Sequence, residues 1–465
     1  MQEKKEKKKL KIISKVLPDG TMLEMIINKE GRSQFAIYTE GVVIYEDEDL
    51  GYRPWSAGNG LITSEVLLFP SKAVKYGSNK ELFDRIVEYL KKYIELQDHF
   101  YNIVAVYCMM TWVYEQFSEV AYLRVLGDFG TGKTRFIKTI SRICYKPMIA
   151  SGSATPSSLF RILDLVGGTF VFDEADFQGS DMWKEMVKIL NSGHTFGGPV
   201  LRSEREGKDG EFSPRAFKVF GPKVIASRNH FGDEALESRC LTEVLIPKKK
   251  LKNAPIALPR DEFEKDGLKI RNQLLMFRFK NYKKIEEFKT EVLTNLDPRM
   301  QQTSLSVLAI AQSIGDQDLT DGIVKFLEEY NKQLQQDRGN SQEVDVLMCL
   351  AKLMLDARCN DKNDPHQIAA FKGIKVAFIA KLFNDAFADE YGMDRGHDSG
   401  HKRGQVSPKK IGEIIRRKLK VITRRQKGGF CVPLEERNKI RRLMSRYGLT
   451  EDSLRDIHCW IHPHK

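Results

Sequence analysis

One glycine-rich segment, GDFGTGKT at residues 127–134, constrains this chain more than any other. It lies between an apolar run, AYLRVL, and a helical pattern, RFIKTISRIC, in the order strand, turn, helix. Gly127, Gly132, Lys133 and Thr134 match the phosphate-binding loop pattern G-x-x-x-x-G-K-[ST] in full. The alternative is a chance Gly/Lys turn after a strand, which the complete pattern between the required elements disfavours.

This loop predicts a site for a nucleoside triphosphate, which we take to be ATP. Its glycines let backbone N–H groups face a polyphosphate, and the following helix adds its positive end. Lys133 can then reach the β and γ phosphates, while Thr134 places its hydroxyl on Mg²⁺. The predicted cofactor-binding residues are Gly127, Asp128, Phe129, Gly130, Thr131, Gly132, Lys133, Thr134 and Arg135.

The composition narrows the class of protein further. The 465 residues are 41% hydrophobic, which supports real cores and excludes wholesale disorder, and the length suits roughly three domains. A formal net charge of +12 favours an acidic partner such as nucleic acid, although many basic proteins carry only solvated lysine faces. The seven cysteines are scattered and form no CxxC pair, as in proteins of a reducing cytosol.

No membrane or export segment is expected. The first residues, MQEKKEKKKLK, are too charged for a signal peptide. The most apolar stretch, residues 101–114, is too short to span a bilayer and predicts a buried helix. We therefore expect a cytoplasmic protein.

Changes of pattern divide the chain into six segments. Near-alternating apolar runs punctuated by Gly, Asn and Asp predict a small antiparallel β domain, and helical periodicity begins near Asn79. The expected segments are a basic tail (1–9), a small β domain (10–70), a helical linker region (71–118), an α/β nucleotide-binding core (119–250), a helical region (251–357) and a basic C-terminal domain (358–465).

Acidic and polar residues follow two further apolar strands. GGTFVFDEAD ends a short strand with Asp173 and Glu174. If that strand lies parallel beside the strand of the loop, Asp173 reaches the Mg²⁺ and Glu174 can orient or deprotonate water; the alternative is an acidic turn. GPKVIASRN ends a third strand with Asn229, which we expect to hold the same water against the γ-phosphate. Arg228 is the competing candidate, and a solvated loop is the third interpretation.

An arginine precedes the next strand in ALESRCLTEVLIP. From this position Arg239 cannot easily reach the nucleotide bound by its own chain. We expect it to act as a finger in a neighbouring subunit's site, where it stabilises charge on the transferring phosphoryl group. That role requires an oligomer. The alternative is a surface pairing with Glu237 or Glu234.

The order of these parts resembles the AAA+ superfamily of P-loop ATPases over roughly residues 119–250. The run KPMIASGSATPSSLFRILDLVGGTFVFDEAD, with ILNSGH and FGPKVIAS, is similar to phage, plasmid and chromosomal-cassette ATPases related to minichromosome-maintenance (MCM) helicases. The likeness implies a ring, expected to be a hexamer, and a helical lid that includes DPRMQQTSLSVLAIA. It makes Arg299 a candidate second sensor of the γ-phosphate; a surface arginine on a lid helix is the alternative.

An inserted segment, HTFGGPVLRSEREGKDGEFSPRAFKVF, precedes the third strand. Its two apolar arms flank a Gly-Lys-Asp-Gly turn and predict a β-hairpin. In the MCM class a hairpin at this place points into the ring channel and grips DNA. Carried onto this sequence, the likeness implies Arg202, Arg205 and Lys208 as DNA contacts. A solvated hairpin is the alternative, because the tip also carries acidic residues.

The basic C-terminal domain gives a second argument for DNA. IKVAFIAKLFNDAFADEYG and SPKKIGEIIRRKLK predict two helices, the second with Ser407 as N-cap and Pro408 in its first turn. VITRRQKGGFCVP predicts a strand, a turn and a strand, so the whole resembles a winged helix, a fold that also serves in protein interactions. Its basic residues would contact phosphates without reading sequence: Lys409, Lys410, Arg416, Arg417, Lys418, Arg424, Arg425 and Lys427.

Three hypotheses for the function follow. The first is an ATP-driven DNA helicase, an oligomeric ring that acts on single-stranded or forked DNA in replication of a mobile element or phage. The second is a AAA+ helicase loader, initiator or switch that assembles on DNA in its ATP form. The third is a DNA-binding regulator whose ATPase only controls assembly.

Overall fold

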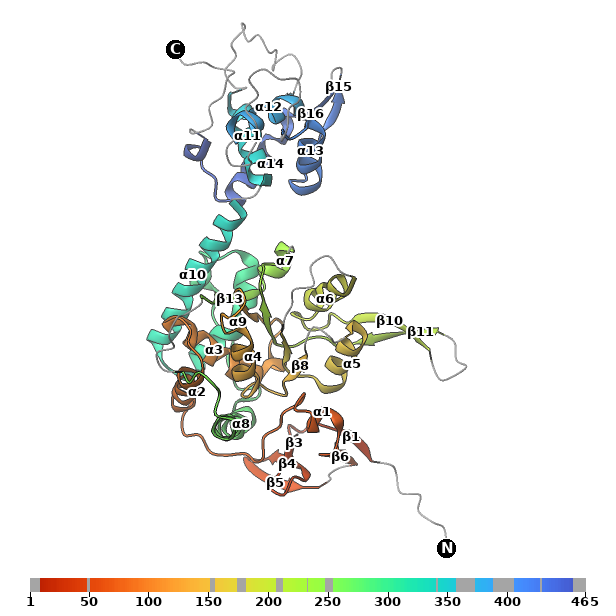
Figure 1. The fold of residues 1–465 in the computed structure, drawn as a ribbon, viewed down its shortest axis with the longest axis vertical. Coiled ribbons are helices and arrows are strands. Elements are labelled where there is room, and N and C mark those ends of the chain that lie inside the picture. Colours follow the sequence, from red (N-terminus) through yellow and green to blue (C-terminus); the bar gives the residue numbers. More distant parts are fainter. Residues whose placement is uncertain are drawn as a thin grey trace. The chain divides into compact units, whose positions relative to one another are not determined.

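The structure is a computed structural model of the whole chain. It describes residues 9–47, 51–150, 155–173, 181–205, 212–231, 233–246, 254–339, 342–356, 373–387, 405–426 and 429–454. The chain divides into two compact units, Met1–Glu328 and Glu329–Lys465 (Figure 1).

A parallel five-stranded sheet lies in the first unit. Its strands stand in the order β13 (Cys240–Val244), β7 (Tyr122–Leu126), β12 (Lys223–Ser227), β9 (Phe170–Phe172) and β8 (Met148–Ala150), and every neighbouring pair is parallel. Nearly all of these strand residues are buried, as expected of parallel strands with covered faces. The chain therefore has the mixed α/β architecture that the sequence predicts around its glycine-rich loop.

One neighbour relation considered from the sequence is not formed in this sheet. The strand that ends before Asp173, β9, does not pair with β7, because β12 lies between them and pairs with both. Local patterns predict where strands lie along the chain but carry no information about their order across a sheet. The carboxyl ends of the three parallel strands still meet at one edge, so the residues that follow them are brought together.

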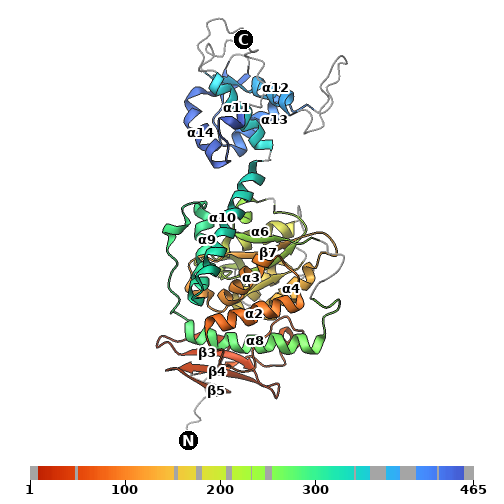
Figure 2. The same ribbon diagram turned by 90° about the vertical axis from the view of Figure 1, so that its left-hand side faces the viewer.

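Several helices complete the first unit (Figures 1 and 2). They are α1 (Gly60–Thr63), α2 (Asn79–Tyr93), α3 (Asp98–Thr111), α4 (Lys133–Ser141), α5 (Pro156–Val166), α6 (Asp181–Ser192), α7 (Glu234–Glu237), α8 (Arg260–Asn281) and α9 (Pro298–Ile314), with 3₁₀ turns at Tyr114–Gln116 and Thr290–Leu293. α10 (Gln317–Gly339) runs across the boundary between the units. α3 is buried along most of its length, which confirms the buried helix predicted from the apolar stretch. In the described part of the chain, no helix is both long and apolar enough to cross a membrane.

The N-terminal strands form the antiparallel sheet that the sequence predicts. β2 (Ser14–Val16), β3 (Met22–Ile27), β4 (Ser33–Thr39) and β5 (Val42–Glu46) pair in sequence order, while β1 (Leu10–Ile12) and β6 (Tyr52–Pro54) pair in parallel. α8 lies along this sheet, between it and α2 (Figure 2). Tyr38 of β4 stacks on Phe279 of α8 with ring centroids 5.1 Å apart. The sheet is thus part of the same compact unit as the parallel sheet.

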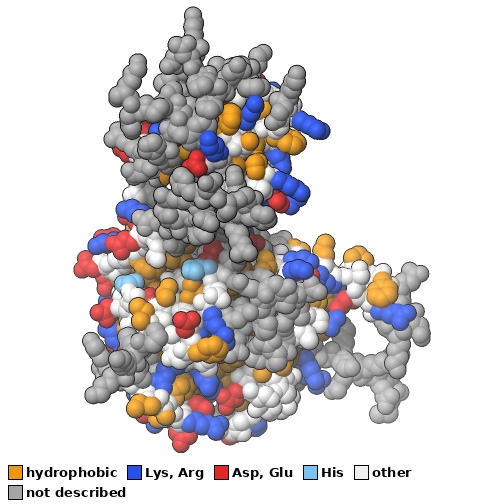
Figure 3. All heavy atoms as spheres, turned by 45° about the horizontal axis from the view of Figure 1, so that its top comes forward, with side chains coloured by type: hydrophobic (Ala, Val, Ile, Leu, Met, Phe, Trp, Pro, Cys, Tyr) orange, Lys and Arg blue, Asp and Glu red, His pale blue; other side chains and the backbone are white. Residues whose placement is uncertain are grey.

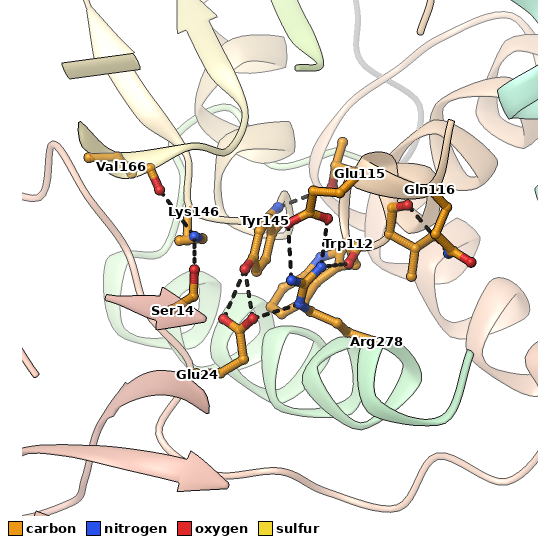
Figure 4. A network of polar contacts seen from close by, with 11 residues as sticks. Ser14, Glu24, Trp112, Glu115, Gln116, Tyr145, Lys146, Val166 and Arg278 are labelled. Atoms are coloured by element: carbon orange, nitrogen blue, oxygen red, sulfur yellow. Dashed lines mark hydrogen bonds and ion pairs between the residues drawn. The ribbon is translucent and has the colours of Figure 1, made fainter. Parts of the chain in front are cut away.

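A buried polar network joins the N-terminal sheet to the rest of this unit (Figure 4). Arg278 of α8 donates to Glu24 of β3 at 2.7 Å and to Glu115 at 2.8 and 3.0 Å. The Tyr145 hydroxyl donates to Glu24 at 2.8 Å. Nearby, Lys146 donates to the Ser14 hydroxyl at 2.6 Å, and burial lowers the pKa of this lysine to about 8. Residues far apart in sequence therefore hold the N-terminal sheet in place through charged hydrogen bonds.

The predicted hairpin is present and projects from the first unit (Figure 1). β10 (Val200–Arg205) pairs antiparallel with β11 (Phe212–Phe217), and the tip, residues 206–211, lies outside the described residues. Buried Lys223, the first residue of β12, holds both roots of this insertion. Its ammonium donates to three backbone carbonyls, those of Gly193 before the hairpin and of Val219 and Gly221 after it, at 3.0, 2.9 and 2.7 Å.

The second unit combines helices with a small sheet. Its elements are α11 (Gln342–Asp356), β14 (Gly373–Lys375), α12 (Val376–Ala386), α13 (Pro408–Glu413) with a π-helical turn (Ile414–Lys418), β15 (Arg424–Gln426), β16 (Gly429–Pro433), α14 (Arg437–Arg446), and 3₁₀ turns at Leu434–Glu436 and Asp452–Leu454. The strands pair antiparallel in the order β14-β16-β15. The Ser407 hydroxyl accepts from the Lys410 N–H at 3.3 Å, which confirms the predicted N-cap. α11, which the sequence assigns to the helical region 251–357, contributes to the core of this unit.

Candidate functional site

The glycine-rich loop lies between the carboxyl end of β7 and the first turn of α4. Gly132 caps α4 with a φ of 99°, a left-handed conformation that favours glycine. A side chain at Gly127 would have no space, because a Cβ there would lie 2.5 Å from Thr131 Oγ1 and 2.8 Å from the Leu245 carbonyl oxygen. Two glycines of the pattern are therefore required by the backbone itself.

Lys133 folds back over this loop. Its Nζ donates to the carbonyl oxygens of Gly127 at 2.5 Å and Asp128 at 2.7 Å. The Thr131 hydroxyl donates to the same Asp128 carbonyl at 2.9 Å. These contacts hold the ammonium at the loop, where an anion could take the place of the two carbonyls.

A cavity of about 310 Å³ opens on the helix side of the loop. It is lined by the consecutive residues Phe129 to Arg135, by Asp173 and by Arg228. The Asp173 N–H donates to the Ala150 carbonyl at 3.1 Å, which ties the residue to the neighbouring strand. Its Oδ1 is buried and has no hydrogen-bond partner among the described residues. Asp173 and Thr134 line the same cavity, and a carboxylate oxygen without a partner together with a hydroxyl fits a hard cation such as Mg²⁺, which prefers oxygen ligands.

The residues that follow β12 differ in their surroundings: one lines this cavity and the next faces solvent. Arg228 lines the cavity, with its guanidinium carbon 3.5 Å from the centre of the Phe129 ring. Asn229 is exposed and does not line it; the Asn229 carbonyl accepts from the Ser227 hydroxyl at 3.2 Å. Glu174 lies outside the described residues. The structure thus brings together Lys133, Thr134, Asp173 and Arg228.

A second cavity, of about 340 Å³, lies against the same loop. Its walls come from residues 94–97 between α2 and α3, from the end of β13 at residues 243–246, and from Ala254 and Phe136. Arg135 donates to the carbonyls of Pro255 and Ile256 and so fixes the segment beside Ala254. Walls of mixed apolar and polar side chains next to the cavity at the loop suit a flat ring with polar edges, such as a nucleobase. The sequence analysis missed these segments, because no motif marks them.

Arg239 and Arg299 lie together, away from the loop. β13 runs parallel to β7 with Cys240 opposite Tyr122, so Arg239 precedes the amino end of the sheet while the loop follows its carboxyl end. Five strand residues separate the two edges by about 16 Å. Arg299 donates to the Ser238 hydroxyl at 3.4 Å. Burial, together with the charge of Arg299, lowers the pKa of Arg239. Neither arginine lies on the two cavities of its own chain.

Buried contacts fix the turn that carries Arg239. Arg239 is 8% exposed and donates to the Asn191 side-chain oxygen. Glu237 pairs instead with buried Arg124, at 2.6 and 2.5 Å. Burial alone would raise the pKa of Glu237, but the hydrogen bonds from Arg124 and His230 outweigh it and lower the pKa to about 2. The surface pairing of Arg239 with Glu237, considered from the sequence, is therefore not formed. The side chain of Glu234, the other partner considered, is not among those that the structure describes.

The three basic residues predicted to contact DNA on the hairpin differ in what lies next to them. Arg202 forms an ion pair with Glu185 of α6. Arg205 lies over the ring of Phe212 on the opposite strand, 5.8 Å from its centre, and that ring is 71% exposed. Lys208 lies outside the described residues. The arms of the hairpin thus present one arginine beside an exposed aromatic ring.

In the second unit, basic side chains lie beside exposed hydrophobic ones (Figure 3). Arg416 lies over the ring of Phe430, 5.2 Å from its centre. Several of the other predicted contacts also have partners: Arg417 pairs with Glu413 at 2.9 Å, Lys418 with Glu343 at 3.3 Å and Arg424 with Glu435 at 3.0 Å. Lys409 and Lys410 stand in the first turn of α13 and are exposed, as is Arg425, while Lys427 lies outside the described residues.

Comparisons with known proteins give weak similarities. No family model and no curated protein matches the chain. Among solved structures, the C-terminal region of NrS-1 is similar over 88% of this chain and 96% of its own length, at 12% identity and a TM-score of 0.36. A full-length MCM homolog from Methanopyrus kandleri covers 70% of this chain and 80% of its own length, at 8% identity and a TM-score of 0.37. The JCV helicase covers 55% of this chain and 69% of its own length, at 14% identity and a TM-score of 0.22. Similarities this weak leave the function to be inferred from the residues of the chain itself.

Proposed function

We propose that this chain is a Mg²⁺-dependent ATP hydrolase of AAA+ type that moves along or separates DNA strands as an oligomeric ring. One observation carries the proposal: Lys133, Thr134 and Asp173 border one cavity beside a loop shaped for phosphate, and Asp173 Oδ1 is buried without a partner among the described residues. This is the arrangement of side chains that phosphoryl transfer from a nucleoside triphosphate requires.

Three residues of the cavity, with the residue after Asp173, would have defined tasks in this reaction. Lys133 leaves the two loop carbonyls and binds the β and γ phosphates, and the N–H groups at the start of α4 bind the same anion. Thr134 and Asp173 would hold Mg²⁺, which when bound neutralises charge that develops on the phosphate oxygens. Glu174, the next residue along the chain, would take the proton of the attacking water. The base would lie in the cavity walled by residues 94–97 and 243–246.

Completion of the site by a second subunit follows from the position of two arginines. Arg239 and Arg299 are adjacent to each other but stand about 16 Å, the length of β13, from the loop of their own chain. We infer that both reach the nucleotide of a neighbouring subunit and stabilise charge on its γ-phosphate. A closed ring, which we propose is a hexamer, supplies every site with this pair.

DNA is the proposed substrate because, in the described part of the chain, exposed arginine and aromatic side chains occur together on the hairpin and again in the second unit. Arg205 with Phe212 on the hairpin, and Arg416 with Phe430 in the second unit, each combine a cation for phosphate with a ring for a base. We propose that the hairpin contacts the strand being moved. The second unit would be a winged helix that binds the duplex, and α8, α9 and α10 would belong to the lid region.

The test is ATP-dependent strand separation on a forked DNA duplex. Lys133→Ala should abolish both hydrolysis and unwinding, because it removes the ammonium from the phosphate cavity. Lys138→Ala is the matched control: this lysine stands five residues further along α4, is exposed and lies outside both cavities. Hydrolysis that survives Lys133→Ala, or is lost equally in Lys138→Ala, would refute the assignment of the cavity.

A second substitution separates the helicase from a AAA+ loader or switch. Glu174→Gln should retain ATP binding but lose unwinding, because a motor needs turnover. A loader or switch would stay active in this variant, since binding alone would assemble it on DNA. ATP hydrolysis stimulated by DNA without any unwinding by the native protein would likewise favour the loader or switch.

A further inference from the structure

α14 carries a basic surface of its own in the second unit. Its buried side, with Ile440 and Met444, belongs to the core of this unit. Residues spaced three and four apart lie on one face of a helix. On α14 such a set is exposed and polar, and it consists of Asn438, Arg441, Arg442 and Ser445. None of the DNA contacts predicted from the sequence lies on this helix, so the face is an addition to them.

The two arginines of this face are available to an anion. Arg441 and Arg442 are exposed, and neither forms an ion pair or a hydrogen bond with another described residue. By contrast, several basic residues of α13, of the turn after it and of β15 pair with glutamates at 2.9 to 3.3 Å. A phosphate that binds the arginines of α14 therefore displaces no carboxylate of the described residues, whereas at the paired positions it must compete with one.

A cavity of about 260 Å³ adjoins the same face. Arg441 and Ser445 line it, together with Arg437 and Glu451. Its other lining residues are apolar: Ala351, Met354, Ile440, Met444 and Leu449. Arg437 donates to the Met354 carbonyl at 3.3 Å, while its Nε is buried without a hydrogen-bond partner among the described residues. The cavity thus combines apolar walls with donors and a carboxylate acceptor.

This combination suits one nucleotide of a single strand. A base in a duplex is stacked and paired, whereas a base in a single strand can leave its neighbours and enter an apolar site. The Glu451 carboxylate can accept from the amino group of such a base, and the adjoining phosphates can bind the exposed arginines. A free nucleotide fits less well, because Arg442 belongs to the face but does not line the cavity.

We propose that the exposed face of α14 binds single-stranded DNA, with one base in the adjoining cavity and the flanking phosphates on Arg441 and Arg442. The inference rests on the proposed action on DNA and adds to it a second form of DNA for the second unit. Duplex is bound at α13, β15 and β16, and a single strand at α14. A forked substrate offers both forms at once.

The experiment measures binding of the full-length protein to a short labelled single strand and to a short blunt duplex by fluorescence anisotropy at several salt concentrations. Every variant, and the parent for comparison, carries Arg205→Gln, which removes the strand contact proposed for the hairpin. Arg441→Gln with Arg442→Gln should weaken single-strand binding by about 10-fold and leave duplex binding within about 3-fold. The slope of log affinity against log salt should become shallower by about 1.4, because each phosphate contact with a single strand contributes about 0.7.

Ser445→Leu tests the cavity, since it narrows the rim without changing the charge. It should weaken single-strand binding by about 3-fold or more, as expected when a base loses its site. A strand that contains 2-aminopurine should become brighter on binding to the parent, because that base leaves its stacked neighbours for a cavity whose lining residues include no aromatic ring. Ser445→Leu should remove this signal.

Lys409→Gln with Lys410→Gln is the matched control, because it removes two exposed positive charges from α13 instead of α14. It should weaken duplex binding more than single-strand binding. Equal loss of both DNA forms in the α14 double variant would overturn the inference, and so would a loss of single-strand binding no larger than in the control. Loss of duplex binding in the control, with single-strand binding unchanged in the α14 variant, would refute the inference alone. Failure of the native protein to bind either form would refute the proposed function as well.

Discussion

Replacement of Arg278 should expose how strongly the N-terminal sheet depends on one buried charge. The Arg278 side chain is 1% exposed and donates to Glu24, to Glu115 and to the Trp112 carbonyl. Methionine has a similar length but neither charge nor donors. Arg278→Met would leave Glu24, whose side chain is 4% exposed, with the Tyr145 hydroxyl as its remaining hydrogen-bond donor among the described residues. Removal of one partner from a buried ion pair costs about 3–5 kcal/mol.

This cost converts into a measurable change of melting temperature. An unfolding entropy of about 2.1 cal/mol/K per residue gives about 0.7 kcal/mol/K for the unit that spans Met1–Glu328. A loss of about 3–5 kcal/mol therefore lowers the melting temperature of that unit by about 4–7 °C. Tryptophan fluorescence is a suitable probe, because Trp55, Trp112 and Trp183 belong to this unit and only Trp460 to the other.

Arg260→Met provides the control on the same helix. Arg260 stands at the first position of α8 with its side chain 81% exposed, so its loss should shift the melting temperature by no more than about 1 °C. Adding Glu24→Met to Arg278→Met should recover part of the loss, because the uncompensated carboxylate is then gone. The reasoning is refuted if Arg278→Met melts within 1 °C of Arg260→Met, or if the second substitution deepens the loss.

Three further expectations concern the loop and the hairpin roots. Gly127→Ala should abolish the stabilisation of the protein by ATPγS in a thermal-shift assay, because its Cβ would meet Thr131 Oγ1 and the Leu245 carbonyl; retained stabilisation would show that the loop can open. Burial, and after it the positive charge of Arg239, lowers the pKa of His194 to about 4. The unfolded chain therefore takes up this proton at a higher pH than the folded chain, and the free energy of unfolding should fall as the pH drops from about 6.5 toward 4. The difference between the urea midpoints at pH 7 and pH 5 should be smaller in His194→Gln than in the native protein. Lys223→Met removes the donor of three carbonyls at the hairpin roots, so trypsin should cut residues 200–217 at least about 10-fold faster, and unchanged cleavage would contradict the anchoring role.

The parts of the fold that depend on neighbouring residues could be predicted from the sequence. The strand before the loop and the helix after it lie at Tyr122–Leu126 and Lys133–Ser141, where the apolar and helical patterns place them. The hairpin and the N-cap Ser407 are confirmed for the same reason, since a turn or a cap is encoded within a few residues. The roles predicted for the site residues stay predictions.

Features that depend on distant residues could not be predicted. The place of β12 between β7 and β9 is set by which strands pair in the folded sheet. The local sequences of three apolar strands are compatible with any order across the sheet. The choice between Arg228 and Asn229 depends on where a strand ends, and a shift of one residue reverses which side chain faces the cavity. Residues 94–97 and 243–246 form a wall only because two connections far apart in sequence meet at the loop.

β12 also connects the proposed site of ATP hydrolysis with the hairpin that is proposed to contact DNA. Its carboxyl end carries Arg228 at the phosphate cavity, and its amino end carries Lys223, whose ammonium holds the roots of the hairpin. All five of its residues are buried, and it is hydrogen-bonded to β7 on one side and β9 on the other. A strand held in this way moves with the sheet rather than bending within it, because its backbone groups are already paired. A change at the phosphate cavity can therefore reach the hairpin only through movement of the sheet against its helices. For this reason Lys133→Ala should remove nucleotide-dependent changes in the trypsin sensitivity of residues 200–217, whereas Lys223→Met should raise that sensitivity in every nucleotide state.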